Sequence, residues 1–404
     1  MTRKKIRVAV VNSHPIQYFA PLYAYISESE DIEITAIYLS NFSIRGGEDK
    51  GFGQVIKWDV DLLAGYNHRF VKGAAEAGQP NGFFALPGAD IWNIVREERF
   101  DAVWLHGHNM APYLIAMAAA KSIGSAVLMR GETHLGLRLP PKKLALRGPL
   151  LGTFYKAVDG FLAIGSANKA FYRAMGVPDE KISIVPYTVD NERFTRVSTL
   201  TAEERVAVRQ KLGASPDRPV VLYASKFMRR KHPDDLVRAA QKLAAEGLEF
   251  DLVMVGSGEM DAELRALVAA SGPKNTVFPG FVNQQELPRV FGAGDVFVLP
   301  SEDEPWGLIV NEAMNAGLPI VLSSEIGCVP DLLREDENGH SFTAGNVDEL
   351  AAALRPMLAD PGKRAAMSQK SRDIIAQWSY QQCLEGLREQ LDRIGRRRGR
   401  PFPQ

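Results

Sequence analysis

Two glutamates, Glu304 and Glu312, stand on either side of a predicted helix start in the stretch EPWGLIVNEAMNAGLP. The strand-like run DVFVLPS ends shortly before Glu304, and Gly317 followed by Pro319 ends the helical pattern. Glu312 then falls in the second turn. The free N–H groups and the positive dipole end of the helix lie between the two acids and favour an anion. A ligand with hydroxyls at both ends and phosphates in the middle, such as a nucleoside diphosphate sugar, matches this pattern.

A basic loop follows another predicted strand in the same half of the chain. In ASKFMRRKHPDDL, Lys226 and Lys231 come after the run VVLYAS. Ammonium groups are compact charges that can neutralise a diphosphate leaving group. The alternative is that the basic loop and the acidic stretch are both solvated surface, since short motifs often match by chance. Their occurrence at the ends of two strands of one domain favours a binding site.

A glycine turn follows a third strand. Gly256 and Gly258 in MVGSGEM resemble part of a dinucleotide-binding fingerprint, but the third glycine is missing. The turn therefore predicts only a close approach of the backbone to a ligand.

The elements that position these residues are those of an α/β protein. Short runs rich in Val, Ile and Phe alternate with amphipathic segments along the whole chain, which predicts βα units and parallel sheets. At 404 residues, two doubly wound domains are expected, with their strand carboxyl ends facing a central cleft. We expect a first domain over 1–195, a second over 196–375, a helix over 376–395 that packs back on the first domain, and a basic tail over 396–404, with the polar segment 190–219 as the link.

Polar side chains also follow three predicted strands of the first half. His14 follows IRVAVVN, the run VWLHGH ends in histidines, and VLMRGETH ends in further polar residues. A single histidine is at least as often structural as it is a ligand contact. Three strand ends that aim polar groups at one rim nevertheless favour an acceptor-binding or active-site rim. Its candidate members are His14, His106, His108, Arg130, Glu132 and His134.

Composition excludes several classes of protein. Lys plus Arg equals Asp plus Glu at 48 each, which gives no indication of nucleic-acid binding. Cys328 and Cys383 lie far apart, which fits a reducing compartment. The N-terminus lacks a signal-peptide pattern, and no apolar run reaches the length of a membrane span. We therefore expect a cytoplasmic protein.

One basic segment leaves membrane contact open. In LRLPPKKLALRGPLLGTFYKAV, Lys142, Lys143 and Arg147 interleave with leucines. This pattern fits a helix lying on an anionic membrane at the inner face of the plasma membrane, where it would meet a lipid-linked acceptor. It fits equally well an ordinary packed helix with snorkelling lysines.

The second half resembles the donor domain of the family 4 glycosyltransferases, retaining enzymes of the GT-B fold. The matching stretches include SIVPYTVD, LVMVGSGEM, VFPGFVNQQELPRVFGAGDVFVLPS and EPWGLIVNEAMNAGLPIVLSS, and they cover roughly 160–354. The N-terminal NSHPIQYFAP, which replaces a glycine-rich loop, resembles a subgroup of bacterial surface-polysaccharide transferases.

The resemblance implies roles for individual residues. Glu304 would contact the donor sugar and Glu312 the ribose. Lys226 and Lys231 would bind the diphosphate, together with the amides around Trp306, Gly307 and Leu308. In the acceptor domain, His106 and Arg130 would approach the donor sugar. Two departures stand out: Ser225-Lys226 replaces the usual Gly-Arg, and Cys328 stands where a second glycine often follows Gly327.

The implied reaction transfers a hexose-type sugar from a UDP or GDP sugar to a glycan or lipid-linked acceptor, in cell-surface polysaccharide biosynthesis. Retention asks for a stabilised leaving group and a positioned acceptor more than for a strong base. The one D-x-D, Asp59 to Asp61, lies beside an apolar run, so we expect no metal and no cofactor. Two alternatives remain: a GT-B nucleotide-sugar epimerase and a non-catalytic sugar-nucleotide-binding assembly protein.

Overall fold

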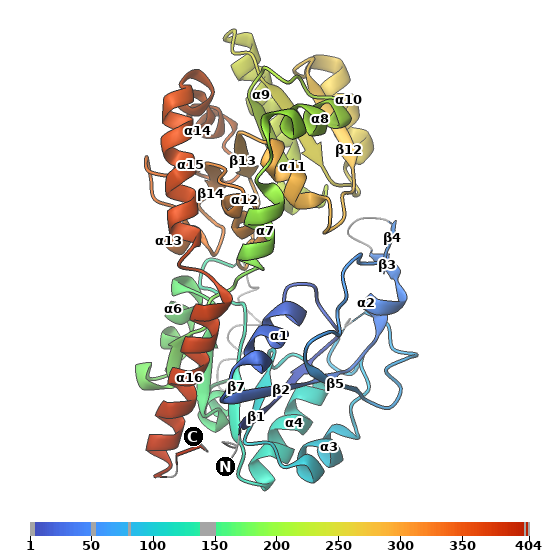
Figure 1. Ribbon diagram of the computed structural model, residues 1–404, viewed down its shortest axis with the longest axis vertical. Helices are drawn as coiled ribbons and strands as arrows, with labels where there is room; N and C mark the ends of the chain where they lie inside the picture. The colour runs from blue at the N-terminus through green and yellow to red at the C-terminus, as the bar shows by residue number, and fades with distance from the viewer. Residues whose placement is uncertain (1–4, 50–53, 80–81, 138–150, 400, 403–404) are drawn as a thin grey trace. The chain divides into compact units, whose positions relative to one another are not determined.

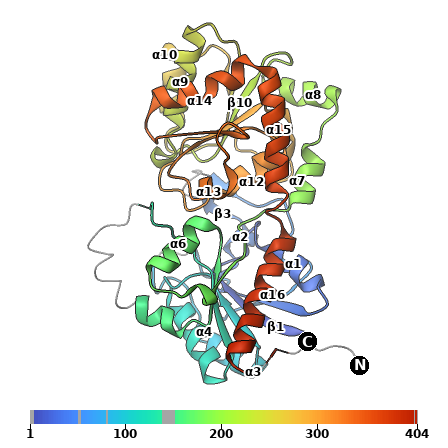
Figure 2. The same cartoon turned by 90° about the vertical axis from the view of Figure 1, so that its left-hand side faces the viewer.

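The computed structural model describes residues 5–49, 54–79, 82–137, 151–399 and 401–402, and the chain divides into two compact units. The first unit comprises 1–47, 56–187 and 380–404, and the second comprises 48–55 and 188–379. Each unit is built on its own parallel sheet (Figures 1 and 2).

The sheet of the first unit has seven strands in the order β5-β2-β1-β6-β7-β8-β9. All pairings are parallel. The strands are β1 (Ile6–Asn12), β2 (Ile32–Tyr38), β5 (Asn67–Phe70), β6 (Ala102–Leu105), β7 (Ala126–Met129), β8 (Gly160–Ala163) and β9 (Ile182–Ile184). The helices are α1 (Ala20–Glu28), α2 (Phe42–Arg45), α3 (Ile91–Glu98), α4 (Ala111–Ser122), α6 (Ser166–Ala174), the 3₁₀ turn η1 (Asp179–Lys181) and α16 (Tyr380–Arg397).

Both faces of this sheet are buried, as expected for a parallel sheet between helices. Along β1, Ala9 and Val11 belong to the core cluster that contains α3 and α4, while Val8 and Val10, which point the other way, are also fully buried. The membrane-surface hypothesis concerns residues 138–150, which lie outside the described residues; 151–157 are helical.

The last helix, α16, returns to the first unit (Figure 2). Gly386 lies so close to β9 that an added Cβ would stand 2.0 Å from the carbonyl oxygen of Ile184. Ser183 donates a hydrogen bond of 2.9 Å to Gln390, and Arg388 pairs with Asp31 at 2.6 Å. The helix begins at Tyr380 rather than at residue 376 as expected, because Trp378 still packs within the second unit, on Trp306.

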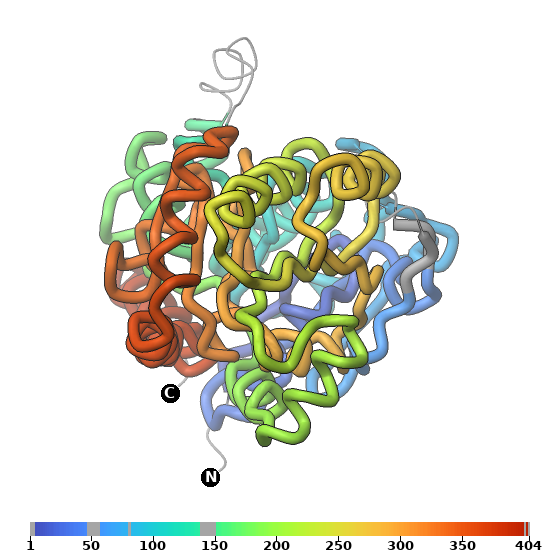
Figure 3. The backbone as a smooth tube through the Cα atoms, turned by 90° about the horizontal axis from the view of Figure 1, so that it is seen from above, coloured from blue at the N-terminus to red at the C-terminus, as the bar shows by residue number. Residues whose placement is uncertain are grey.

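The second unit contains a six-stranded parallel sheet in the order β12-β11-β10-β13-β14-β15. The strands are β10 (Val220–Ala224), β11 (Asp251–Val255), β12 (Thr276–Gly280), β13 (Val296–Leu299), β14 (Ile320–Ser323) and β15 (Gly339–Phe342). The helices are α7 (Asn191–Ser198), α8 (Ala202–Leu212), the 3₁₀ turn η2 (Arg229–Lys231), α9 (Pro233–Ala245), α10 (Asp261–Ser271), α11 (Leu287–Ala293), α12 (Leu308–Asn315), α13 (Val329–Leu332), α14 (Val347–Ala359) and α15 (Pro361–Ile375). Figure 3 shows α9 and α10 side by side. A separate two-stranded sheet pairs β3 (Gly47–Asp49) with β4 (Gln54–Ile56).

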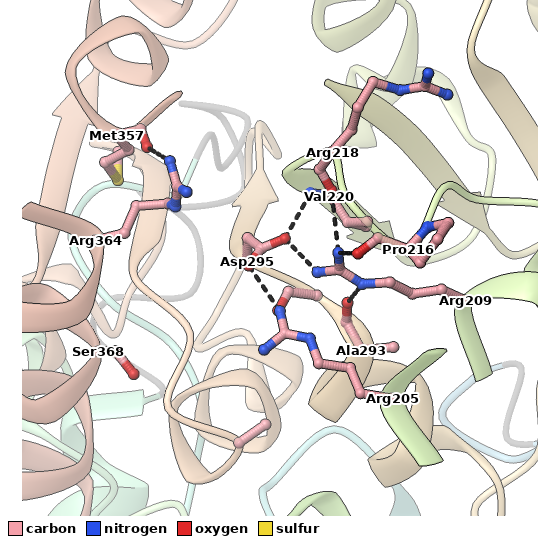
Figure 4. Close-up of polar contacts among 12 residues, drawn as sticks. Arg205, Arg209, Pro216, Arg218, Val220, Ala293, Asp295, Met357, Arg364 and Ser368 are labelled. Atoms are coloured by element: carbon pink, nitrogen blue, oxygen red, sulfur yellow. Dashed lines mark hydrogen bonds and ion pairs between the residues drawn. The ribbon is translucent and has the colours of Figure 1, made fainter. Parts of the chain in front are cut away.

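The segment interpreted as an interdomain link is in fact part of the second unit. Arg209 of α8 is buried, pairs with Asp295 and donates to the carbonyl oxygens of Ala293, Pro216 and Arg218 (Figure 4). Asp295 also pairs with Arg205. The expected boundary between residues 195 and 196 falls inside α7, whereas the two units meet between residues 187 and 188. Most of α8 is exposed, which accounts for its polar composition, while Arg209 and its partners fasten the helix to the second unit.

The architecture confirms the predicted fold class: an α/β protein with two Rossmann-like, doubly wound sheets. In both sheets the strand order reverses once. The reversal lies between β1 and β6 in the first unit and between β10 and β13 in the second. In open parallel sheets, ligands bind outside the carboxyl ends of the strands at this reversal.

Candidate functional site

In the second unit, the loops that follow β10 and β13 leave the sheet side by side at the reversal point. β10 pairs directly with β13, through Val221 with Val296 and Leu222 with Phe297. The first loop carries the predicted Lys226 and Lys231, and the second carries Glu304. The sheet therefore brings together the two groups of residues that the sequence analysis placed in one site.

Lys231 and Glu304 form an ion pair across these two loops. The Lys231 side chain is 10% exposed and that of Glu304 is 14% exposed, so the pair is shielded from solvent. Burial lowers the pKa of Lys231, and the carboxylate of Glu304 opposes that change. A second cation, Arg230, places Nη1 at 4.0 Å from Glu304. The site thus holds one carboxylate against two cations.

Three further residues of these loops, which were not predicted from the sequence, belong to the site: Arg230, His232 and Glu302. The amide of Glu302 donates to the carbonyl oxygen of Arg230 at 2.8 Å, which joins the two loops through their backbones. His232 pairs with Asp235 at 2.9 Å and lies 3.6 Å from Glu302. These acids raise the pKa of His232, the bond to Asp235 being the largest cause. The contacts of Arg230, His232 and Glu302 form only because the two loops lie close together, and no local pattern in the sequence reveals this.

Glu304 itself is held in place by the segment before α13. Its carbonyl oxygen accepts a hydrogen bond of 3.0 Å from the amide of Gly327. Cys328, the departure noted beside Gly327, is fully buried, and burial together with the nearby Glu304 carboxylate raises the pKa of its thiol well above the usual value. The thiol therefore stays protonated beside the acid.

Helix α12 begins directly after this loop. Gly307 precedes it with φ of 88°, a conformation that costs other residues energy. A Cβ there would also lie 3.2 Å from Ile326 Cγ2. The N-cap residue, Gly307, has no side chain with which to cap the first N–H groups of the helix, and these groups are those that favour an anion. Glu312, in the second turn, has no exposed surface, which rules out the solvated helix face considered as an alternative.

The Trp306 side chain has a structural role. Its indole N–H donates to Asn311 Oδ1 at 2.9 Å, and its ring lies 5.2 Å from that of Trp378. Its carbonyl oxygen accepts from the amide of Cys328 at 3.2 Å. These contacts fix the turn that leads into α12. The phosphate cradle expected from the amides of Trp306, Gly307 and Leu308 stays a prediction.

Packing within the protein explains why residues 256 and 258 are glycines. A Cβ on Gly256 would stand 2.0 Å from the carbonyl oxygen of Ser225, and one on Gly258 would stand 2.6 Å from that of Phe227. Phe227 donates its amide to Ser257 at 2.9 Å. The glycine turn thus approaches the backbone around Lys226, and this contact explains both glycines without a ligand.

In the first unit, the loops after β1, β6 and β7 carry the predicted rim. His106 follows β6, and its Nε2 lies 2.8 Å from the hydroxyl of Tyr23. Its ring stacks on Trp104 at 5.3 Å and lies 4.5 Å from Phe19. Burial, and to a smaller extent the charge of Arg130, lowers the pKa of His106 well below its usual value. His106 is therefore neutral at physiological pH.

Arg130 and Glu132 follow β7 and meet the same cluster. The Arg130 guanidinium lies 4.9 Å from the Tyr187 ring centroid and 5.6 Å from that of Phe19. Glu132 accepts a hydrogen bond of 2.7 Å from the Tyr187 hydroxyl. Phe19, Tyr23, Trp104 and Tyr187 were not predicted as site residues, since aromatic residues in apolar runs look like core.

The other three histidines of the rim differ in position. His14 bonds Ser13 at 2.9 Å, and burial lowers its pKa to about 4. Since Ser13 also bonds Asn12, which bonds Tyr23, His14 borders the His106 cluster. His108 instead packs near Phe154 and Tyr155, and His134 accepts from the amide of Gly136 at 3.1 Å. The structure therefore groups His106, Arg130 and Glu132, with His14 at the border and His108 and His134 in contacts of their own.

No group of three or more His, Cys, Asp or Glu side chains that could hold a metal ion occurs within the described ranges. Asp61 of the D-x-D accepts a 2.9 Å hydrogen bond from the amide of Leu63, which forms a local turn. The helices of the described part of the chain include none long and apolar enough to cross a bilayer.

Comparison with known proteins agrees with the fold. The family model "Glycosyl transferases group 1" matches residues 204–374, and "Glycosyltransferase Family 4" matches residues 55–193. Together the two models span most of both units.

Two relatives and one solved structure illustrate the similarity. A GDP-mannose-dependent monoacylated alpha-(1-6)-phosphatidylinositol monomannoside mannosyltransferase of Corynebacterium glutamicum is 29% identical over 73% of this chain and 77% of its own. A D-inositol 3-phosphate glycosyltransferase of Xylanimonas cellulosilytica is 30% identical over 56% of this chain and 54% of its own, so the match spans about half of that relative. Among solved structures, HepE of Anabaena in complex with UDP superposes with a TM-score of 0.71, at 17% identity, over 96% of this chain and 99% of its own. The chain belongs to the family 4 glycosyltransferases and has their GT-B fold.

Proposed function

We propose that the protein is a retaining glycosyltransferase that moves a hexose-type sugar from a UDP or GDP sugar to a saccharide or lipid-linked acceptor. The observation that carries this proposal is the buried Lys231–Glu304 pair at the β10–β13 reversal, beside the start of α12 and the buried Glu312. In this proposal, Glu304 binds the sugar, the cations and the helix start bind the diphosphate, and Glu312 binds the ribose.

The cations stabilise the departing diphosphate. Lys226, Arg230 and Lys231 supply positive charge in a partly water-excluded loop, where it acts more strongly than in bulk solvent. When the diphosphate binds, it competes with Glu304 for Lys231, and this frees the carboxylate to accept a hydrogen bond from a sugar hydroxyl. In this account the ion pair holds both side chains in place until the donor arrives.

The ribose role of Glu312 follows from its distance along the helix. It lies five residues after Gly307, about 7 to 8 Å along a helix that rises roughly 1.5 Å per residue. That span separates a diphosphate at the helix start from the ribose that is attached to it. A buried carboxylate also binds two hydroxyls more tightly than an exposed one, because water competes less for it.

The first unit binds the acceptor in this proposal, with His106 as a hydrogen-bonding group close to the reacting sugar. Because burial keeps His106 neutral, it offers an N–H or a lone pair rather than a charge. In the proposed retaining reaction, the acceptor hydroxyl attacks the sugar from the same face that the diphosphate leaves. An oxygen of the departing diphosphate then takes the proton of that hydroxyl. The protein therefore supplies orientation of the acceptor rather than a strong base. We propose that neither a metal nor another cofactor takes part.

The cellular setting is also proposed. Cys328 and Cys383 are both buried and unpaired, which suits a cytoplasmic protein. The corynebacterial relative is named for a lipid-anchored acceptor, which supports a lipid-linked acceptor for this chain and peripheral contact with an anionic membrane at its inner face. Synthesis of cell-surface polysaccharide is the pathway in which we place it.

A donor panel tests the proposal. The protein is incubated with UDP, GDP and ADP sugars without acceptor, and the released nucleoside diphosphate and free sugars are measured. A transferase releases nucleoside diphosphate slowly from donors of one base and leaves the sugar unchanged. Formation of a new sugar would indicate an epimerase, and binding without any release, even with glycan acceptors added, would indicate a non-catalytic protein.

A further inference from the structure

Arg130 is a buried cation whose hydrogen-bonding capacity is largely unmet. It is 2% exposed, and its Nη2 donates to the carbonyl oxygen of Pro186 at 3.2 Å. Among the described residues, its Nε and Nη1 have no hydrogen-bond partner. A guanidinium has five N–H donors, and a buried donor without a partner costs free energy. An unsatisfied buried polar group calls for an explanation, and a site for a ligand is one of them.

The surroundings of Arg130 stabilise its charge without satisfying its donors. Aromatic faces attract the cation but accept no ordinary hydrogen bonds; the rings of Phe19, Trp104 and Tyr187 lie 4.9 to 5.9 Å from the guanidinium carbon. Arg130 forms no ion pair with a carboxylate in the described part of the chain. The nearby Glu132 is engaged by the Tyr187 hydroxyl instead.

The position of Arg130 is that of a ligand-binding residue. It comes directly after β7, next to β6 and two strands from β1, so it lies at the carboxyl edge beside the reversal of the first sheet. Since His106 is neutral, Arg130 is the positive charge of this cluster. A carboxylate or phosphate oxygen is the complement for such a cation, because charge-assisted bonds to guanidinium are the strong ones.

We infer that Arg130 binds an anionic group of the acceptor, so that the acceptor is an acidic or phosphorylated saccharide rather than a neutral one. This inference deepens the proposed function, on which it rests, by naming the chemical class of the acceptor. The aromatic rings then hold the guanidinium ready, and the ligand satisfies Nε and Nη1.

Binding of small probes tests the inference on the full chain. Glucuronate, glucose 1-phosphate and methyl α-glucoside are titrated by ligand-observed NMR, with saturating nucleoside diphosphate present to occupy the phosphate site of the second unit. Wild-type protein should bind glucuronate or glucose 1-phosphate about ten- to a hundredfold more tightly than the neutral glucoside, the value of a charged hydrogen bond. The two acidic probes separate a carboxylate site from a phosphate site.

Two variants and one control complete the test. Arg130→Met removes charge and donors, and Arg130→Gln keeps a donor without charge; both should lose the preference for the acidic probes. Arg96→Met is the matched control, since Arg96 also lies over an aromatic ring, Trp92 at 5.3 Å, but is exposed. It should keep the preference.

The inference is overturned if wild-type protein binds all three probes equally, a result that needs no variant to fold. It is also overturned if folded Arg130→Met retains the preference. Release of nucleoside diphosphate by wild-type protein in the donor panel is measured in parallel, so that failure of the acceptor inference is distinguished from failure of the proposed transferase function.

Discussion

At the scale of single residues, Glu304 has two partners in succession in our account: Lys231 in the free protein and the donor sugar in the complex. The ion pair is shielded from water, so removal of Glu304 leaves the buried Lys231 without its counter-charge, whereas removal of Lys231 leaves Glu304 with the more distant Arg230. Glu304 therefore contributes to stability in the free protein and to turnover in the complex. The two contributions can be measured separately.

Glu304→Gln should lower turnover by about ten- to a hundredfold, since a charge-assisted hydrogen bond to the sugar is lost. Affinity for the nucleoside diphosphate should be kept or increased, because Lys231 no longer has a competing partner. Steady-state release of nucleoside diphosphate and a binding titration measure the two quantities. Glu263→Gln, which removes the surface partner of Arg229, is the control. Wild-type turnover in Glu304→Gln would remove this residue from the site.

Glu312→Ala should weaken binding of the nucleoside diphosphate about ten- to a hundredfold while leaving the affinity for inorganic pyrophosphate unchanged. The physical reason is that pyrophosphate has no ribose for the carboxylate to bind. Calorimetric titration of both ligands gives the ratio directly, which cancels general effects of the variant on the fold. An equal loss for both ligands would argue against a ribose contact.

His14 should make stability depend on pH. Its pKa is about 4 in the folded protein and ordinarily about 6.5, so between these values the unfolded chain binds more protons. Stability from this group is complete above pH 6.5 and falls by about 3 kcal/mol as the pH drops to 4. Urea unfolding of wild-type protein and His14→Phe between pH 7.5 and 4.5 checks this. The variant should lose less stability on acidification; parallel curves for the two proteins would contradict the buried neutral state of His14.

At the scale of elements, the parallel strands position the site, and the loops after them depend on each other. The turn at Gly256 supports the backbone of the loop that carries Lys226, and Glu302 joins that loop to the one that carries Glu304. A change in one loop should therefore reach the others.

Gly256→Ala should weaken binding of the nucleoside diphosphate and lower the melting temperature. Its Cβ would overlap the carbonyl oxygen of Ser225, and φ of 137° is unfavourable for alanine. Gly247→Ala is the matched control, with φ of 86° but no atom within 4 Å of the new Cβ. It should share the modest loss of stability and leave binding intact. If both variants bound nucleotide like wild type, the glycine turn would have no part in shaping the donor loop.

The existence of the helices and strands could be predicted from the sequence more accurately than their first and last residues or their contacts. Hydrophobic runs predicted eleven of the described strands, β1, β2 and β6 to β14, whereas the short, polar strands β5 (NHRF) and β15 (GHSF) were not recognised. The spacing of Glu304 and Glu312, together with the basic loop, predicted the residues that the second sheet brings together. Arg230, His232 and Glu302 could not be predicted, because their contacts arise only when two loops meet. The aromatic residues around Arg130 were not predicted because, in the sequence, they cannot be distinguished from residues of the hydrophobic core.

At the scale of the whole molecule, the chain is a pair of Rossmann-like units, each with polar residues at the reversal of its own sheet. The charges are divided between them: a cationic loop with carboxylates in the second unit, and one buried guanidinium with neutral histidine in the first. The second unit is accordingly the one to which we assign the nucleotide.

The measurement that tests this assignment most directly is a titration of wild-type protein and Lys231→Met with the nucleoside diphosphate that it binds best. Arg229→Met serves as the control, because Arg229 lies in the same loop but pairs with Glu263 on the surface. We predict that affinity falls about ten- to a hundredfold in Lys231→Met and stays unchanged in the control. Equal affinity in folded Lys231→Met and wild type would contradict the donor site at the β10–β13 reversal.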